Sequence, residues 1–384
     1  MYRRYLVVFV VTLAAVLLLV GGFAQVVDPF ACNEWVRQPG FNRDKTRLVT
    51  RIAKIMHVSC HDYDAMVFGT SRASFLPIDH PAWKGYRPYN FALAAASINE
   101  TRLALAYTQR VHPLKRVAIG LDFFMFGAQP QLPESAAAFL SATRKARPNL
   151  VDYSLTLLAV STAVETVWDN LDQSRGGILR AAHAGAADES GQDQLPEFRG
   201  QIWGFQKIYS KINFPPEVLS ELTRIVEFSR KQGIELSLYI NPQHASILEV
   251  IRERGWWDAY ENWKRSITRI AWRGGKDPVP LYDFSGYNAY TTEPVPTAEN
   301  GYRRMQWYVD SSHFQYAVGA RILDRLFGAD NGEAPRVPGF GVRLRPDTVE
   351  RDLAEIREQR EAWLATNPPE LAWVRELGQQ LPAN

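Results

Sequence analysis

The sequence predicts an α/β protein with a mostly parallel sheet covered by helices on both faces, preceded by one transmembrane helix. Short apolar runs alternate with helical segments from about residue 64 onward, which is the pattern of a parallel sheet covered on both sides. The N-terminus is an uncharged apolar stretch. The composition, 46% hydrophobic and 22% charged residues over 384 positions, is that of a globular protein and excludes disorder or a multi-span membrane protein.

The N-terminal segment predicts the cellular location. Arg3 and Arg4 precede Tyr5–Val27, which contains no charged residue and is long enough to cross a hydrocarbon core of about 30 Å. Two interpretations remain open: a retained anchor, which the length favours, or a signal peptide cleaved after residues 22–24 (GFA). The basic residues should stay in the cytoplasm. The Ala, Arg and Pro usage suggests a Gram-negative bacterium, so we expect a single-pass inner-membrane protein whose part after Asp28 is periplasmic.

Charge and motifs exclude several partners. The chain has 44 basic and 41 acidic residues, for a net charge of +3, and no run of Lys or Arg, so we expect no nucleic-acid partner. It has no GxGxxG or GxxxxGK[ST] motif, so a nucleotide cofactor has no support. The seven histidines are scattered, and no group has the spacing of a metal site. We therefore expect neither a metal nor a cofactor.

The two cysteines, Cys32 and Cys60, both lie early in the exported part. In an oxidising compartment we expect them to form a disulfide. The alternative is a pair of buried free thiols.

Each predicted element has a local reason. Residues 64–68 and 116–124 are apolar strands, and 87–91 is a weaker one. A helix begins at Ser97, where Ser97 and Glu100 have capping-box spacing. Prolines 215 and 216 suit a helix start, and Gly233 ends that helix before a strand at 234–241. The remaining elements are helical segments at 150–171, 244–273 and 316–327, a strand at 279–284, and a charged helical tail at 345–380 broken at Pro368–Pro369.

This order predicts a simple domain organisation. Residues 1–27 form the membrane segment, and one α/β domain spans 28–330 with an insertion at about 130–215. Within that insertion the polar stretch 183–197 is expected to be mobile. Residues 331–384 form a charged C-terminal tail.

The first candidate site residue is Ser71. In parallel sheets, sites collect at the carboxyl ends of the strands, which points to residues 69–72, Asn90, Asp122 and 241–244. Ser71 follows the first strand, where its hydroxyl can face the crevice. The alternative is an N-cap serine of the next helix.

The second candidate is the D-x-x-H sequence of Asp310 and His313, just before the 316–327 helix. A serine nucleophile needs a base, and a histidine base needs a carboxylate to fix its tautomer. One turn can supply both groups. The alternative is a capping aspartate beside a surface histidine.

Together these motifs resemble those of the SGNH/GDSL hydrolase superfamily. GTSR at 69–72 is similar to its first block and DSSH at 310–313 to its last. Segments 89–93 and 119–124 are similar to a membrane-anchored exported subgroup, which includes proteins of alginate O-acetylation and of teichoic-acid D-alanylation. The resemblance covers about 60–128 and 234–327. It implies an SGNH-hydrolase-like (flavodoxin-like) fold with Ser71 as nucleophile, His313 as general base and Asp310 as its orienting group.

The resemblance also has departures. The third block is usually G-x-N-D, but here Asp122 stands where the oxyanion-donating Asn belongs, and an ionised carboxylate only accepts hydrogen bonds. The glycine of the second block has no counterpart after Asn90. Three alternatives follow: Asn90 supplies the donor, Asp122 binds Arg72 and orders the site, or activity is weak. Arg72 is either that structural partner or a contact to an anionic substrate, and His244 either lines the substrate groove or packs in the fold.

The expected function is an acyltransferase or esterase that acetylates or deacetylates an exported or cell-surface polysaccharide. By resemblance, a membrane-bound O-acyltransferase would supply the acyl group. The tyrosine-rich stretch 282–308 is the expected sugar contact, because it flanks the D-x-x-H motif. A non-catalytic scaffold or glycan-binding component of an export complex is the main alternative. A lipid esterase ranks last, because no long apolar loop lies near the motifs.

Overall fold

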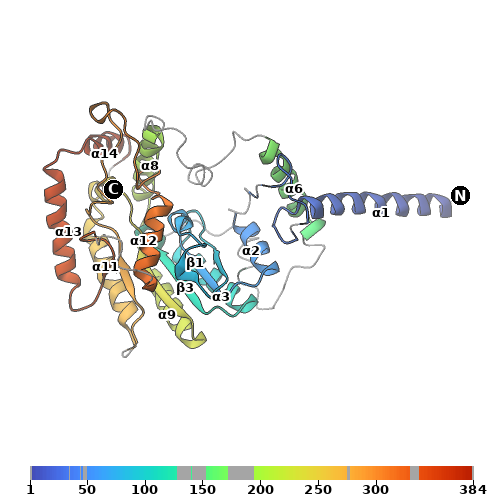
Figure 1. Ribbon diagram of the computed structural model, residues 1–384, viewed down its shortest axis with the longest axis horizontal. Helices are drawn as coiled ribbons and strands as arrows, with labels where there is room; N and C mark the ends of the chain where they lie inside the picture. The colour runs from blue at the N-terminus through green and yellow to red at the C-terminus, as the bar shows by residue number, and fades with distance from the viewer. Residues whose placement is uncertain are drawn as a thin grey trace. The chain divides into compact units, whose positions relative to one another are not determined.

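A computed structural model describes residues 2–33, 35–43, 45, 50–127, 140, 153–171, 194–274, 277–328 and 337–382 (Figure 1). The chain divides into two compact units. Unit 1 comprises Met1–Asp62, Tyr107–His112 and Leu132–His183, and unit 2 comprises Tyr63–Ala106, Pro113–Gln131 and Ala184–Asn384. The organisation therefore differs from the single domain expected over 28–330, since the N-terminal region and part of the expected insertion form a unit of their own.

Unit 1 is helical. It contains α1 (Tyr2–Val27), α2 (Arg51–Cys60) and α6 (Leu157–Leu171). Among the described residues, α1 is the one helix long and apolar enough to cross a membrane. The expected disulfide is confirmed: Cys32, shortly after α1, is bonded to Cys60 at the end of α2, with 5.6 Å between their Cα atoms. The disulfide joins two residues that are 28 positions apart in the sequence, and closing a loop of that length stabilises the fold by about 3 to 4 kcal/mol.

Unit 2 contains a six-stranded sheet in the order β2-β1-β3-β4-β5-β6. Strands β1 to β5 are parallel, and the short edge strand β6 is antiparallel to β5. The order of the parallel strands, 2-1-3-4-5, is a doubly wound order in which the direction of winding reverses between β1 and β3. The strands are β1 (Ala65–Phe68), β2 (Pro88–Asn90), β3 (Arg116–Leu121), β4 (Glu235–Ile240), β5 (Leu281–Asp283) and β6 (Val342–Arg343).

The central strands are buried, which explains their apolar sequences. Every residue of β1 is buried, as are all residues of β3 and β4 except their first. A parallel sheet with covered faces requires this continuous burial. The carboxyl ends of β1, β3 and β4 lie next to one another, because the register pairs Phe68 with Ile119 and Leu121 with Ile240. Residues that follow these three strands therefore meet at one edge of the sheet.

The helices of unit 2 follow the predicted order with three differences. The expected helix 244–273 is two helices, since Gly255 (φ 73°) takes a left-handed conformation between them. The strand expected at 116–124 ends at Leu121, and Phe123–Phe126 forms the 3-10 helix η4. Of the polar stretch 183–197, only 194–197 lie within the described residues, where they begin a helix. The helices are α3 (Ile98–Val111), α8 (Gln194–Tyr209), α9 (Leu219–Gln232), α10 (Ala245–Glu253), α11 (Trp257–Trp272), α12 (Tyr316–Phe327), α13 (Val349–Leu364) and α14 (Glu370–Gln379).

The C-terminal tail is part of unit 2. Helix α13 packs on α11 (Figure 1). Helix α14 packs on α8 and α10. The break between α13 and α14 occurs at Pro368–Pro369, as the sequence predicts. The tail therefore does not form the separate segment that its charge suggested.

Candidate active site

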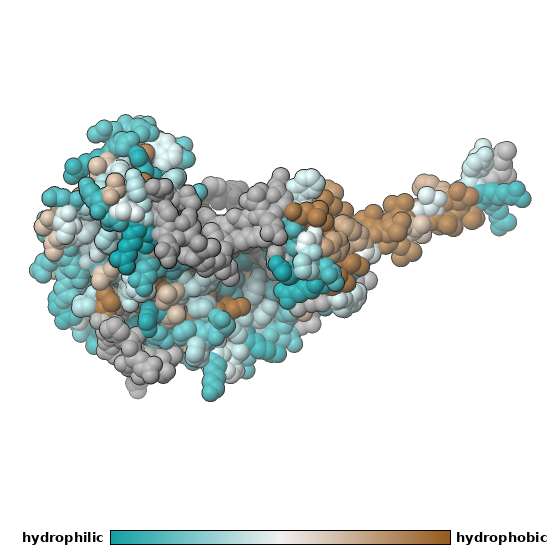
Figure 2. All heavy atoms as spheres, turned by 45° about the horizontal axis from the view of Figure 1, so that its top comes forward, coloured by the Kyte–Doolittle hydropathy of each residue, from teal (hydrophilic) through white to brown (hydrophobic). Residues whose placement is uncertain are grey.

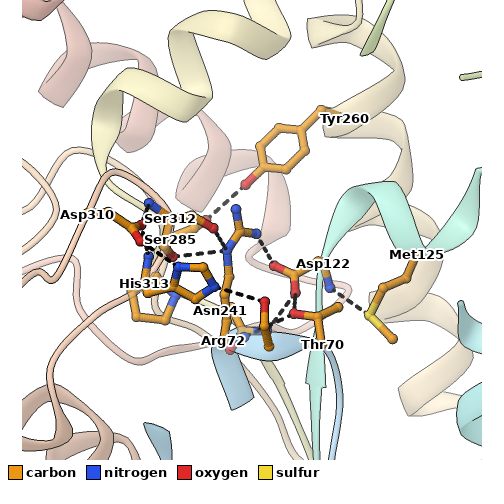
Figure 3. A network of polar contacts seen from close by, with 12 residues as sticks. Thr70, Arg72, Asp122, Met125, Asn241, Tyr260, Ser285, Asp310, Ser312 and His313 are labelled. Carbon is orange, nitrogen blue, oxygen red and sulfur yellow. Dashed lines mark hydrogen bonds and ion pairs between the residues drawn. The ribbon is translucent and has the colours of Figure 1, made fainter. Parts of the chain in front are cut away.

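Ser71, His313 and Asp310 form a continuous chain of hydrogen bonds. The Nε2 atom of His313 lies 2.9 Å from Ser71 Oγ, although 242 positions separate the two residues. On the other side of the ring, Nδ1 lies 2.8 Å from Asp310 Oδ2. Figure 3 shows His313 and Asp310 next to each other. A neutral imidazole that donates its Nδ1 proton to Asp310 leaves Nε2 free to accept the proton of Ser71.

The local backbone explains why Ser71 occupies this position. Gly69 has φ 142°, and a Cβ there would lie 2.8 Å from both Ala73 Cβ and Gly120 O, so only glycine fits this turn. Thr70 then caps the 3-10 helix η2 (Ser71–Phe75) by accepting a hydrogen bond from Arg72 N. The N-cap is thus Thr70 rather than Ser71, and the Ser71 hydroxyl remains half-buried and directed at His313.

The loop that carries Asp310 and His313 is held by the aspartate itself. Asp310 Oδ1 accepts hydrogen bonds from the backbone N–H groups of Ser312 (2.7 Å) and His313 (2.8 Å). A bridge between Tyr308 and Phe314 closes the loop. Both Asp310 and His313 are buried. The D-x-x-H motif is therefore a capped turn, but its histidine faces Ser71 rather than the surface.

A buried ion pair lies beside the serine. Arg72 Nη1 pairs with Asp122 Oδ1, and Arg72 Nε donates to both the carbonyl and the hydroxyl of Ser312 at 3.1 Å (Figure 3). Of the two alternatives for Arg72, the structure supports pairing with Asp122. The guanidinium also lies over the ring of Phe205, 4.8 Å from its centroid. One side chain thus joins the end of β3 to the D-x-x-H loop.

The second carboxylate oxygen of Asp122 is also occupied. Asp122 Oδ2 accepts from Thr70 Oγ1 (2.6 Å) and from Asn241 Nδ2 (3.0 Å). Thr70 follows β1, Asp122 follows β3 and Asn241 follows β4. The ends of three neighbouring strands are therefore tied to one carboxylate.

The expected oxyanion donors are used elsewhere. Asp122 accepts hydrogen bonds through both oxygens and donates none from its side chain. One of the three alternatives had Asn90 donate to an oxyanion, but its Nδ2 donates to Ala73 O (2.8 Å) and Leu76 O (3.2 Å) and so supports η2. The backbone N–H of Ser71 makes no hydrogen bond among the described residues. It is therefore available to donate to a negative charge that develops next to Ser71 Oγ.

Of the two alternatives for His244, a residue that lines the substrate groove or one that packs in the fold, the structure supports packing. His244 is fully buried at the start of α10, where Nδ1 accepts from Ser246 N and Nε2 donates to Glu293 O at 2.9 Å. Burial lowers the pKa of His244 to about 4, so the ring is neutral. His244 is a packing and capping residue, because both ring nitrogens already have protein partners.

The aromatic residues of the tyrosine-rich stretch differ in their exposure. Tyr287, Tyr290 and Tyr308 of the stretch 282–308 are buried, so these three rings are not presented to a sugar, whereas Tyr282, Tyr302 and Trp307 are half-buried. Two aromatic rings that the sequence did not single out lie nearer the site. Phe75 of η2 lies 5.6 Å from the His313 ring and 5.5 Å from Tyr316, which is half-buried at the start of α12. In the sequence, only their positions close to residues 69–72 and 310–313 could have pointed to Phe75 and Tyr316.

The described residues contain no group of three or more His, Cys, Asp or Glu that could hold a metal ion. No protein-family model matches the chain, and no curated protein matches it in sequence. The chemistry of the site must therefore be inferred from its own geometry.

Proposed function

We propose that the protein is a serine-dependent O-acyltransferase or esterase of the SGNH/GDSL type that acts on an exported or cell-surface polysaccharide. The observation that carries the proposal is the hydrogen-bonded chain from Ser71 through His313 to Asp310. Its position adds support, since Ser71 follows β1 next to the reversal of a 2-1-3-4-5 sheet, where flavodoxin-like folds bind their ligands.

The first half of the reaction forms an acyl-enzyme. His313 Nε2 takes the Ser71 proton as Oγ attacks the acyl carbonyl, and Asp310 holds the ring in the required tautomer. The Ser71 N–H donates to the carbonyl oxygen as it becomes negative. When the tetrahedral intermediate collapses, the bond from the acyl carbon to the leaving oxygen breaks, and His313 returns the proton to that oxygen.

The second half releases the acyl group. His313 removes a proton from a sugar hydroxyl or from water, and the resulting oxygen attacks the acyl carbon of the Ser71 ester. Attack by a sugar hydroxyl gives transfer, and attack by water gives hydrolysis. In both cases the proton returns to Ser71 Oγ when its ester bond breaks.

The location belongs to the same proposal. Helix α1, with Arg3 and Arg4 in its first turn, supports a single-pass anchor in a bacterial inner membrane with the remainder in the periplasm. The Cys32–Cys60 disulfide is consistent with an oxidising compartment. A membrane-bound O-acyltransferase would then deliver the acyl group across the membrane, as in the subgroup that the motifs resemble.

A scaffold that keeps the fold without catalysis is the second candidate. It is favoured by one observation: Asn90 and Asp122 are both committed to internal hydrogen bonds, so neither side chain supplies an oxyanion donor beside Ser71 N–H. An active enzyme of this class would be expected to use more than one donor.

Turnover of p-nitrophenyl acetate by the full chain in detergent separates the two candidates. The matched control is Ser71→Ala, and each protein is assayed with and without short glucan or uronate oligomers. We expect nitrophenol to be released and acetyl groups to appear on the oligomer, and we expect both to depend on Ser71. Equal rates for both folded proteins would instead favour the scaffold.

A further inference from the structure

Helix α6 of unit 1 has its polar and apolar faces reversed relative to a helix of a soluble protein. The side chains that it buries include Thr162, Thr166, Asp169 and Asn170. Its exposed apolar residues are Leu157 (86% exposed), Val164 (52%), Trp168 (55%) and Leu171 (67%), and the polar Ser161 and Glu165 are exposed beside them. The four apolar residues lie at spacings of seven, four and three, so they form one stripe along the helix. A helix in contact with water normally shows the opposite arrangement.

The same helix packs against the end of α1. Ala24 and Val27 of α1 form one apolar cluster with Ala163, and Val167 packs against it. One turn earlier, the side chains of Gln25 and Ser154 are hydrogen-bonded. A Cβ at Gly21 would lie 3.0 Å from Leu155 Cδ2, so the chain approaches α1 closely here. The region of α6 is thus fixed beside the last two turns of α1.

The apolar surface of α1 continues at this junction. Figure 2 shows brown, hydrophobic surface running from the protruding α1 onto the part of unit 1 at its base. Phe23 and Val26, at the end of α1, are exposed together with the α6 stripe. Because the apolar run of α1 exceeds the roughly 20 residues that a bilayer core requires, the turns that contact α6 fall where the chain leaves the hydrocarbon.

We propose that α6 lies in the membrane interface beside α1, with Leu157, Val164, Trp168 and Leu171 among the lipid acyl chains. The inference rests on α1 being the membrane anchor of the proposed function, and it places α6 in the periplasmic leaflet. Tryptophan is characteristic of this depth. Helix α6 contains no Lys or Arg, so the attachment is apolar and does not require anionic lipid. With two contacts to the bilayer, unit 1 cannot rotate freely about the axis of α1.

Site-specific fluorescence in nanodiscs tests this proposal. Full-length variants Trp168→Cys and Leu171→Cys, labelled with an NBD probe, are placed in phosphatidylcholine nanodiscs with and without doxyl-labelled lipid. The native cysteines do not react, because they form a disulfide. Glu227→Cys, on an exposed position of α9, is the aqueous control, and Leu13→Cys in α1 reports on the anchor.

We expect blue-shifted emission at 168 and 171 with quenching by doxyl lipid to less than half the intensity, and water-like, unquenched emission at 227. Replacing a third of the lipid by phosphatidylglycerol should leave the quenching unchanged. Water-like emission at 168 and 171 would overturn the proposal. So would blue-shifted emission without quenching, because the stripe would then be covered by protein. An unquenched probe at position 13 would instead contradict the proposal that α1 is a membrane anchor. The probes at positions 168 and 171 test α6 independently of that result.

Discussion

Arg72, the residue next to the nucleophile, is ion-paired in the protein interior with Asp122, the residue that follows β3. Asp122 stands where the SGNH/GDSL superfamily, which the motifs resemble, has an oxyanion-donating asparagine. The ion pair with Arg72 gives Asp122 a different role. The carboxylate accepts from Thr70, Arg72 and Asn241, and Arg72 holds the loop of the general base through Ser312. The pair therefore acts as a positioning element under the triad.

Replacing Asp122 by Asn tests this role. Asp122→Asn leaves the buried Arg72 charge without its partner, and breaking a buried pair in this way costs about 3–5 kcal/mol. We expect the free energy of unfolding, measured by urea denaturation, to fall by that amount and esterase activity to fall with it. Unchanged stability with faster turnover would show instead that position 122 serves the oxyanion hole.

Asn90 is expected to be structural as well. Asn90→Asp removes the two hydrogen bonds that Nδ2 donates to Ala73 O and Leu76 O. Ala73 O keeps the hydrogen bond from Leu76 N, whereas Leu76 O loses its amide donor, and leaving a buried carbonyl unpaired costs about 1–3 kcal/mol. We expect a loss of stability of that order in urea denaturation, with a loosened η2. A fall in kcat of about a hundredfold without any loss of stability would identify Asn90 as an oxyanion donor.

Stability should respond to acid through His244. Its pKa is about 4 in the fold, against an ordinary value of 6.5, so between these values the unfolded chain binds a proton that the folded protein does not. Its contribution is therefore full above pH 6.5 and is lost as pH falls toward 4, by about 2 kcal/mol between pH 7 and 5. Urea denaturation at the two pH values should show a smaller loss for His244→Gln than for the wild type.

Glu370 provides a control of opposite sign. Burial raises its pKa to about 7 from 4.5, so its contribution is full below pH 4.5 and is lost as pH rises through 7. Between pH 7 and 5 it offsets about 2 kcal/mol of the loss from the histidine. Glu370→Gln should therefore steepen the acid destabilisation that His244→Gln reduces. The same direction of change in both variants would contradict this assignment.

The fold was largely predictable because burial dictates its pattern. The apolar runs of β1, β3 and β4 are buried strands, and Gly233 ends α9 in a left-handed conformation as expected. Gly255 was overlooked as a break between α10 and α11, since the apolar periodicity continues across it. The edge strand β6 consists of two residues, too few to produce a pattern.

The nucleophile, the base and its orienting carboxylate were predictable, because each of these roles requires a particular type of side chain. Residues 69–72 follow the end of β1 and residues 310–313 directly precede α12, and α12 packs on η2, so Ser71 meets His313 and Asp310. The donors of the oxyanion hole were not predictable, because an asparagine amide serves a substrate or a backbone carbonyl equally well. Only the tertiary contacts show that Asn90 supports η2. Nor does the sequence reveal that His244 is buried, because a histidine at the start of a helix can be either exposed or buried.

The most direct test of the central claim is peptide mass spectrometry after reaction of the full-length protein with a fluorophosphonate. We expect one adduct, on Ser71, absent from Ser71→Ala and formed about a hundredfold to ten-thousandfold more slowly in His313→Gln. The neighbouring Ser312→Ala variant should retain the adduct. Absence of any adduct on folded protein, or an adduct that forms equally fast without His313, would contradict a nucleophilic Ser71 activated by His313.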